Sequence, residues 1–99
     1  KVKHTALLQN YPNPFNPETW IPYRLAEQSE VSLEIYKAAG DLVRTIKLGV
    51  RPPATYESKN EAIYWDGRAE SGERVSSGIY FYHLQAGKYE AMRKMLVLK

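Results

Sequence analysis

Apolar and polar residues alternate with a period of two along much of this chain, and this alternation predicts β-strands. The clearest case is residues 31–36, Val-Ser-Leu-Glu-Ile-Tyr, where aliphatic side chains fall on one face and polar ones on the other. Such a run is typical of a half-buried antiparallel strand. The short connection Ala39–Asp41, which contains a glycine, predicts a β-hairpin to residues 42–46.

Residues 20–25 show the same period. The odd-numbered residues of this run are expected to face inward, and Trp20 is expected on the outward face, either as a contact for a neighbouring domain or partner or as an incidentally exposed side chain. Because proline cannot donate a backbone hydrogen bond, Pro22 marks the run as an edge strand. The proline-containing stretch of residues 49–60 that follows the hairpin is expected to be a long surface loop.

The second half of the chain continues the pattern. Residues 62–65 end in Trp65, which is expected to anchor the core with its indole N–H bonded to a partner. A strand is expected to start at Gly78 and to turn Tyr80 inward, and the last strand is expected over residues 89–98. About seven short strands at this spacing predict an all-β fold, an immunoglobulin-like antiparallel β-sandwich.

The N-terminal part is different in kind. Residues 11–17 contain three prolines and two asparagines, which excludes a regular strand or helix and predicts a stiff, ordered loop. Tyr11 and Phe15 are expected to dock this loop into the core. The predicted organisation is therefore a linker and entry segment over residues 1–10 and one sandwich domain over residues 11–99.

Composition narrows the possibilities. The chain has 99 residues, 43% of them apolar, which suffices for one core, and it has no cysteine for disulfides or thiolate metal sites. No run is long and apolar enough to span a bilayer, and the first residues do not resemble a signal peptide. If the parent protein is exported, its leader is expected upstream.

The net charge of +3 is concentrated at one end of the chain. Residues 1–87 hold ten Lys and Arg against ten Asp and Glu, whereas residues 88–99 hold four cations against Glu90. Four cations on one segment are a weak nucleic-acid footprint, so a solvated strand is favoured and no nucleic-acid partner is expected.

Candidate chemistry is sparse. The two histidines, His4 and His83, have no nucleophile or ligand set beside them, so no catalytic residue is predicted. Residues 66–73 contain three carboxylates that could hold calcium, but a turn in which Asp66 accepts backbone amides and Gly67 takes a positive φ is favoured. The tyrosines are expected mostly in the core, which argues against a sugar-binding face. No cofactor is predicted.

Several motifs together resemble a known family. The residues that carry the resemblance are Leu8–Thr19 with its core Tyr11, Pro12, Asn13, Pro14 and Phe15, then Val31–Tyr36, Gly40, Val43-Arg44, Trp65-Asp66-Gly67, Gly72, Val75 and Ser77–Tyr82 with Gly78 and Tyr80. This succession resembles the C-terminal sorting domain of type IX secretion cargo and the related immunoglobulin-like domain of flagellar hook-capping proteins. The chain departs from the family's pattern at Trp20 and in a longer loop over residues 50–61.

The resemblance implies a seven-stranded sandwich attached to an upstream passenger protein. It implies an outer-membrane translocon and a sortase-like protease as partners, and a secreted or cell-surface location reached through the periplasm. Residues 94–99 correspond to the family's terminal basic and apolar motif, so Lys94, Met95, Val97 and Lys99 are the expected recognition residues. The domain is not expected to insert directly into a membrane, and it is expected to be a monomer.

Two other functions remain open. The domain could be a structural spacer or protein-docking module that never meets a translocon, and residues after Lys99 would favour that alternative. An enzyme or an independent lectin is disfavoured because the sequence shows no convergent polar cluster.

Overall fold

The computed structural model describes all 99 residues and contains nine β-strands and no helix. The fold class predicted from the alternation is confirmed, although it has more strands than the predicted seven. No helix that could cross a membrane is present. The strands are β1 (Ala6–Leu7), β2 (Thr19–Ile21), β3 (Tyr23–Leu25), β4 (Ser29–Lys37), β5 (Leu42–Arg51), β6 (Ala54–Tyr56), β7 (Ile63–Trp65), β8 (Gly78–Ala86) and β9 (Tyr89–Val97).

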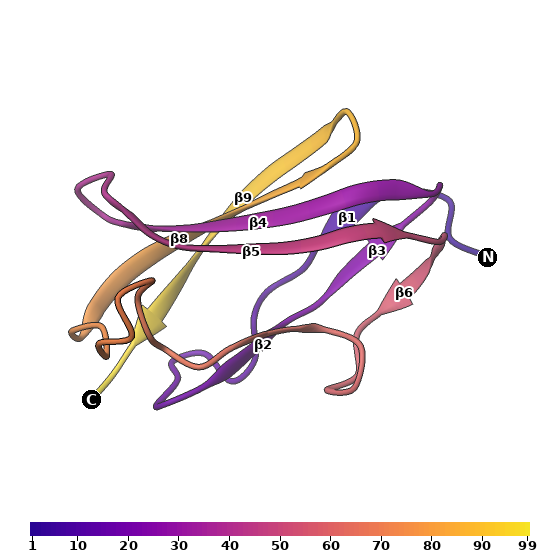
Figure 1. Ribbon diagram of the computed structural model, residues 1–99. Helices are drawn as coiled ribbons and strands as arrows, with labels where there is room; N and C mark the ends of the chain where they lie inside the picture. Colours follow the sequence, from indigo (N-terminus) through magenta and orange to yellow (C-terminus); the bar gives the residue numbers. More distant parts are fainter.

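The larger layer is a four-stranded antiparallel sheet in the order β5-β4-β8-β9, which forms the upper part of Figure 1. The predicted hairpin between β4 and β5 is confirmed. Its turn is closed by the amide of Lys37 bonding to the carbonyl of Asp41 at 2.9 Å, with Gly40 at φ +101°. Every second residue of β4 and β8 is buried, as the alternation predicts.

The second layer consists of two small sheets, β1-β3-β6 and β2-β7, of which β2, β3 and β6 lie below β5 in Figure 1. The predicted single edge strand over residues 20–25 is therefore wrong. Pro22 is buried between β2 and β3, its carbonyl accepts the amide of Leu8 at 3.0 Å, and the chain changes sheets at this point. Proline has no amide to donate, which suits a residue at a break between strands.

The predicted surface loop over residues 49–60 is also shorter than expected. β5 continues to Arg51, and β6 pairs with β3 in the register Tyr23 to Tyr56, with the two rings stacked at 4.6 Å. Periodicity did not indicate β6 because it is only three residues long and has no fully buried side chain.

The sandwich begins before the predicted boundary at Tyr11. Ala6 pairs with Arg24 and Leu7 with Tyr23, and Leu7 is buried. Part of the segment assigned from the sequence to a linker is thus a strand of the second layer.

One apolar core fills the space between the layers. Three of the eight tyrosines are buried in it, and Tyr56 and Tyr89 are partly buried against it, so most tyrosines face the core, as expected. The buried apolar residues are Leu7, Phe15, Ile21, Tyr23, Leu25, Val31, Leu33, Ile35, Val43, Ile63, Trp65, Val75, Tyr80, Tyr82, Leu84, Ala86, Met95 and Val97.

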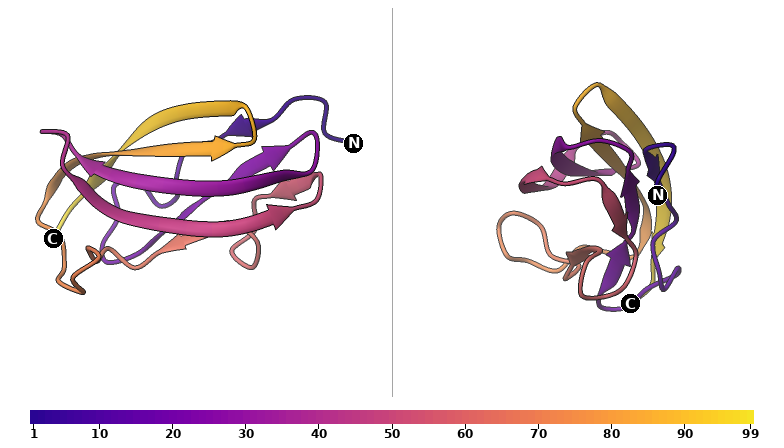
Figure 2. Two further views of the ribbon diagram at one scale, coloured as in Figure 1. Left: turned by 45° about the horizontal axis from the view of Figure 1, so that its top comes forward. Right: turned by 90° about the vertical axis from the view of Figure 1, so that its right-hand side faces the viewer.

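The two termini lie at opposite ends of the long axis of the molecule, as both side views show (Figures 1 and 2). This axis is 38 Å long. The β4–β5 turn lies at the end that carries the C-terminus (Figure 1).

Candidate interaction surface

The proline-rich entry loop and the Trp-Asp-Gly turn meet at one end of the core. The buried ring of Phe15 packs edge-on against Trp65, with ring centroids 5.5 Å apart. Gly67 has φ +77° and lies so close to Pro17 that a Cβ at this position would overlap the Pro17 carbonyl oxygen. The two motifs are therefore far apart in the sequence but in direct contact in the folded domain.

Trp65 is the anchor that the sequence predicted. Its side chain is fully buried, its indole N–H donates to the carbonyl of Arg68 at 2.9 Å, and it also packs against Tyr80 at 6.1 Å. The hydroxyl of Tyr80 in turn donates to the carbonyl of Ser76, 2.9 Å away. Trp65, Phe15 and Tyr80 thus form one aromatic cluster with a structural role.

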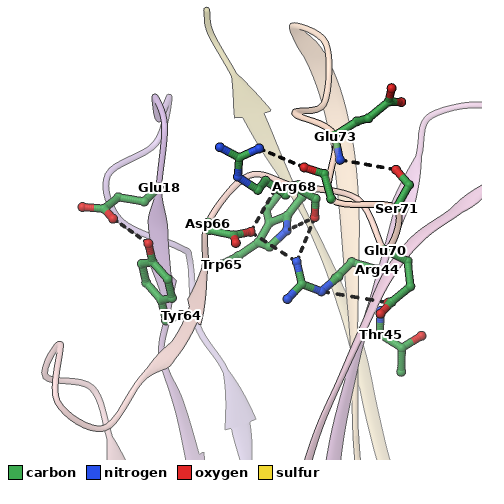
Figure 3. A network of polar contacts seen from close by, with 11 residues as sticks. Glu18, Arg44, Thr45, Tyr64, Trp65, Asp66, Arg68, Glu70, Ser71 and Glu73 are labelled. Atoms are coloured by element: carbon green, nitrogen blue, oxygen red, sulfur yellow. Dashed lines mark hydrogen bonds and ion pairs between the residues drawn. The ribbon is translucent and has the colours of Figure 1, made fainter.

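The turn after Trp65 is held by its own polar contacts (Figure 3). Asp66 accepts the amide of Arg68 at 3.0 Å and the guanidinium of Arg44 at 3.2 Å. The carbonyl of Arg68 also accepts Arg44, and the carboxylate of Glu70 accepts the amide of Thr45. No group of three or more potential metal ligands is present in the chain. The hydrogen bond from the amide of Arg68 confirms the predicted role of the Asp66 carboxylate in the turn.

Tyr11 and Trp20 differ from their predicted positions. Tyr11 is half-buried at the side of the sandwich, not in the core, and its hydroxyl donates to the carbonyl of Glu57. Trp20 lies between Tyr11 at 6.3 Å and Tyr64 at 5.5 Å, and the Lys59 ammonium sits 4.3 Å from its ring centroid. Because its own chain covers the indole, the structure offers little of Trp20 to a partner.

The remaining motif residues have structural positions. Pro12, Asn13 and Pro14 are exposed, and the side-chain oxygen of Asn13 accepts the amide of Leu96 at 2.9 Å. Gly78 begins β8, as predicted, and pairs with Val97.

The terminal strand β9 is built into the fold. Met95 and Val97 are buried and Lys94 is exposed, as alternation predicted, and Lys99 is exposed because it lies beyond the end of β9 at Val97. The outer edge of β9 is covered by the entry loop, because the amide of Phe15 bonds to Leu96 and the amide of Leu98 bonds to Phe15, each at 3.0 Å. A partner cannot add a strand to this part of β9 while the loop is in place.

Tyr82 ties the same N-terminal segment to the larger sheet. Its hydroxyl accepts the amide of Asn10 and donates to the carbonyl of Leu8, both at 2.9 Å. Burial raises the pKa of Tyr82 to about 12.

The outer face of the four-stranded sheet, which includes β9, remains accessible. At the end near the β4–β5 turn this face carries apolar side chains at consecutive cross-strand positions. We call this set the outer-face patch; its members are Tyr36, Leu42, Ile79, Phe81, Met92 and Leu96. Sequence reasoning missed it, although the uninterrupted apolar run over residues 79–82 contradicts simple alternation and was its signal.

The model of the FlgD Ig-like domain matches residues 18–90 of this chain. The chain belongs to this family. Its antiparallel all-β architecture fits an immunoglobulin-like domain.

Three solved structures with the same fold match between 74% and 98% of this chain. Dimeric latent PorU from Porphyromonas gingivalis matches with a TM-score of 0.72, 19% identity and 98% of this chain covered. PorZ, described as an essential surface component of the type IX secretion system of that organism, matches with a TM-score of 0.64 and 21% identity over 95% of this chain. FlgD from P. aeruginosa matches with a TM-score of 0.59 and 26% identity over 74% of this chain.

This chain is a small part of most of these proteins. It spans 10% of PorU, 12% of PorZ and 57% of FlgD. A search of curated proteins finds no match.

Proposed function

We propose that this domain is a non-catalytic sorting and anchoring module that directs an upstream passenger protein through the type IX secretion system to the cell surface or medium. The observation that carries the proposal is the way the resembling motifs meet: Phe15 of the entry motif packs on Trp65 and bonds to the terminal strand. The full succession of motifs thus describes one folded unit. The fold likeness to PorZ, a surface component of that system, supports the same setting.

In this proposal an outer-membrane translocon recognises the folded domain and a sortase-like protease releases or anchors the passenger. Of the predicted recognition residues in the terminal motif, Lys94 and Lys99 are the ones that a partner can touch, because both are exposed. Met95 and Val97 act indirectly by holding β9 in the core.

A second function is favoured by a separate observation. The family match and the likeness to FlgD, at 26% identity, support a docking or spacer domain of a larger extracellular protein that is never read by a translocon. The two functions differ in whether the domain alone suffices for export.

The test fuses residues 1–99 to the C-terminus of a periplasm-targeted fluorescent protein in a host that has type IX secretion. We expect fluorescence at the surface or in the medium with the intact domain. A Lys94→Glu, Lys99→Glu version should be exported less, and its stability should change by less than about 0.5 kcal/mol because both side chains are exposed.

Retention of the intact fusion in the periplasm would exclude sorting and leave the docking function. Equal export of both versions would retain sorting and exclude the two lysines as the recognised groups. A host that lacks the secretion system provides the control for leakage.

A further inference from the structure

Strand β9 is at the edge of the four-stranded sheet, and its outer edge is covered over only part of its length. It pairs with β8 alone. The entry loop covers the C-terminal half, where Phe15 and Asn13 bond the main chain of Leu96. Near the β8–β9 turn no other strand is paired with this edge. Unpaired main-chain groups on an edge strand are a template for another strand.

The register identifies the main-chain groups that are open. In an antiparallel strand the amides and carbonyls of alternate residues point to opposite edges. Since Leu96 points to the entry loop and the β8–β9 register is unbroken, Glu90, Met92 and Lys94 point to the same edge. Among their amides and carbonyls only the carbonyl of Lys94 has a partner, the side-chain amide of Gln9 at 2.9 Å.

Strand β1 does not cover this stretch of the edge. The amide of Leu7 donates to the hydroxyl of Tyr89 at 3.2 Å, and the carbonyl of Leu7 accepts the guanidinium of Arg93 at 2.8 Å. Tyr89 and Arg93 occupy the same register positions as the buried Met95, on the inner face of the sheet. β1 therefore packs under β9 through side chains and leaves its outer main-chain groups free.

The side chains along the open edge form a self-complementary pattern. Glu90, Met92 and Lys94 are all exposed on the outer face of the strand, with opposite charges on either side of an apolar residue. If the strand pairs antiparallel with its own copy about Met92, Glu90 of each copy lies opposite Lys94 of the other. Directly opposed side chains of opposite charge stabilise a strand pair, and like charges destabilise it.

We propose that β9 pairs with β9 of a second copy of this chain, antiparallel and centred on Met92, so that the two four-stranded sheets become one. The amide and carbonyl of Met92 then meet those of the second Met92, and the amide of Lys94 meets the carbonyl of Glu90. The amide of Glu90 meets the carbonyl of Lys94, which has a second lone pair beside its bond to Gln9. Such a two-fold contact is closed, because the same surface serves both copies. A dimer differs from the monomer expected from the sequence.

Charge and the entry loop select this register over its neighbours. A shift that places Glu90 opposite Met92 also brings Lys88 opposite Lys94, two like charges. The opposite shift brings Glu90 to Leu96, whose edge is already occupied by the entry loop. Only the register centred on Met92 pairs all the open groups without either conflict.

The other groups near the contact are compatible with it. One carboxylate oxygen of Glu90 lies 2.9 Å from His83, and the side chain is still 60% exposed, so its second oxygen can face a lysine. On the inner face the register places the small Ala91 opposite Arg93 of the second copy. No two like charges are directly opposed in the pair.

The expected association is weak, because a pairing of this length buries far less than the roughly 1,200–2,000 Å² of a stable interface. Sedimentation equilibrium of the purified chain from micromolar to millimolar concentration should show a dimer that increases with concentration. In the isotope-labelled chain, the amides of Glu90, Met92 and Lys94 should shift over the same range. The amides of β5, the other edge of the sheet, should not.

Two charge reversals test the pairing directly. Lys94→Glu makes both charges of the edge negative, and Glu90→Lys makes both positive. Each variant alone should dimerise at least about tenfold more weakly than the parent, because two opposite-charge contacts become like-charge contacts. An equimolar mixture of the two should form a mixed dimer, and the double variant Glu90→Lys, Lys94→Glu should dimerise like the parent.

Lys47→Glu is the matched control. Lys47 is exposed on β5, so the same change of charge is made on the opposite edge of the same sheet. The control should change the dimer dissociation constant by less than about twofold. Thermal unfolding of each variant should match that of the parent, because the replaced side chains are exposed.

Several results would overturn the proposal. A parent chain that stays monomeric at millimolar concentration excludes the pairing. Failure of the two single variants to form a mixed dimer excludes this register. A dimer that Lys47→Glu weakens as much as Lys94→Glu, or concentration-dependent shifts confined to β5, would place the contact on the other edge.

The inference goes beyond the proposed function and can fail independently of it. Dimerisation is measured on the purified chain without a translocon, so a monomeric chain overturns the pairing and leaves the export test unaffected. Retention of the intact fusion in the periplasm would exclude sorting, and the sedimentation experiment would still decide whether β9 pairs.

Discussion

At the scale of single residues, Gly67 links the entry loop to the Trp-Asp-Gly turn. It combines a positive φ with a close approach to Pro17, whereas Gly72 has φ +91° and open space around its Cα. A substitution at Gly72 would therefore cause backbone strain alone, whereas one at Gly67 would cause both backbone strain and steric overlap.

Gly67→Ala should lower the free energy of unfolding by about 3 kcal/mol or more, because an alanine there is strained and also strikes backbone. Gly72→Ala should cost only about 1–2 kcal/mol from its φ alone. Urea unfolding of both variants gives the comparison. Equal costs would mean that the entry loop moves away from the turn freely.

Tyr82 offers a second residue-scale test. Tyr82→Phe removes one acceptor and one donor and leaves the amide of Asn10, in a buried residue, without its partner. The expected loss is about 1–3 kcal/mol in the free energy of unfolding. The hydroxyl of Tyr36 contacts only the Glu34 side chain, so Tyr36→Phe should lower the free energy of unfolding much less in the same experiment.

Two buried tyrosines, Tyr82 and Tyr23, make the stability of the domain depend on pH in the alkaline range. Burial raises the pKa values of Tyr82 and Tyr23 to about 12, against about 10 for an unfolded tyrosine. Between these values the folded chain keeps protons that the unfolded chain has lost, so the free energy of unfolding falls as the pH rises from 10 to 12.

Below pH 10 the stabilisation from these two phenols is fully present. Urea midpoints across this alkaline range should show the decline, and Tyr82→Phe should make it shallower. A decline of the same slope in Tyr82→Phe would assign the effect to other groups.

At the scale of elements, β9 and the entry loop form one unit although they lie near opposite ends of the sequence. Phe15 joins them twice: through its buried ring on Trp65 and through backbone hydrogen bonds to Leu96 and Leu98. A terminal strand that is bonded on both edges is part of the body of the domain, not a free tail.

Phe15→Ser should therefore increase hydrogen exchange at the amides of Leu96 and Leu98 as well as in the loop itself, before the rest of the sandwich opens. Asn16→Ser, at an exposed neighbour, is the matched control and should leave exchange unchanged. If Leu98 keeps its protection in Phe15→Ser, the loop and the strand open separately.

At the scale of the whole molecule, the long axis separates the N-terminus from the β4–β5 turn (Figures 1 and 2). In the proposed sorting function, a passenger attached at Lys1 would therefore lie at the end of the sandwich opposite this turn.

Fusing a folded protein to Lys1 should leave the melting temperature of the domain within a few degrees of that of the isolated domain, because the N-terminal residues before β1 are mostly exposed. Thermal unfolding followed by circular dichroism gives the comparison. A large drop in the melting temperature would show that the fused protein disturbs the pairing of β1 with β3.

The sequence alone determined the features that depend on near neighbours. The period of two in residues 31–36 placed Val31, Leu33 and Ile35 in the core, and the same reasoning placed Met95 and Val97 inward. It also predicted the burial of Trp65 and the hydrogen bond of Asp66 to its own turn. Side chains on alternate faces of a strand are a local property, so the pattern records it directly.

Only the tertiary structure decided the features that depend on distant backbone. The change of sheet at Pro22, the pairing of Ala6 with Arg24, and the seal of Phe15 over β9 all join segments that no local pattern connects. The same holds for Trp20, which alternation turned outward and which Lys59 and two tyrosines then cover. Alternation says which way a side chain points from its strand. What lies there is decided by which strands and loops pack beside it.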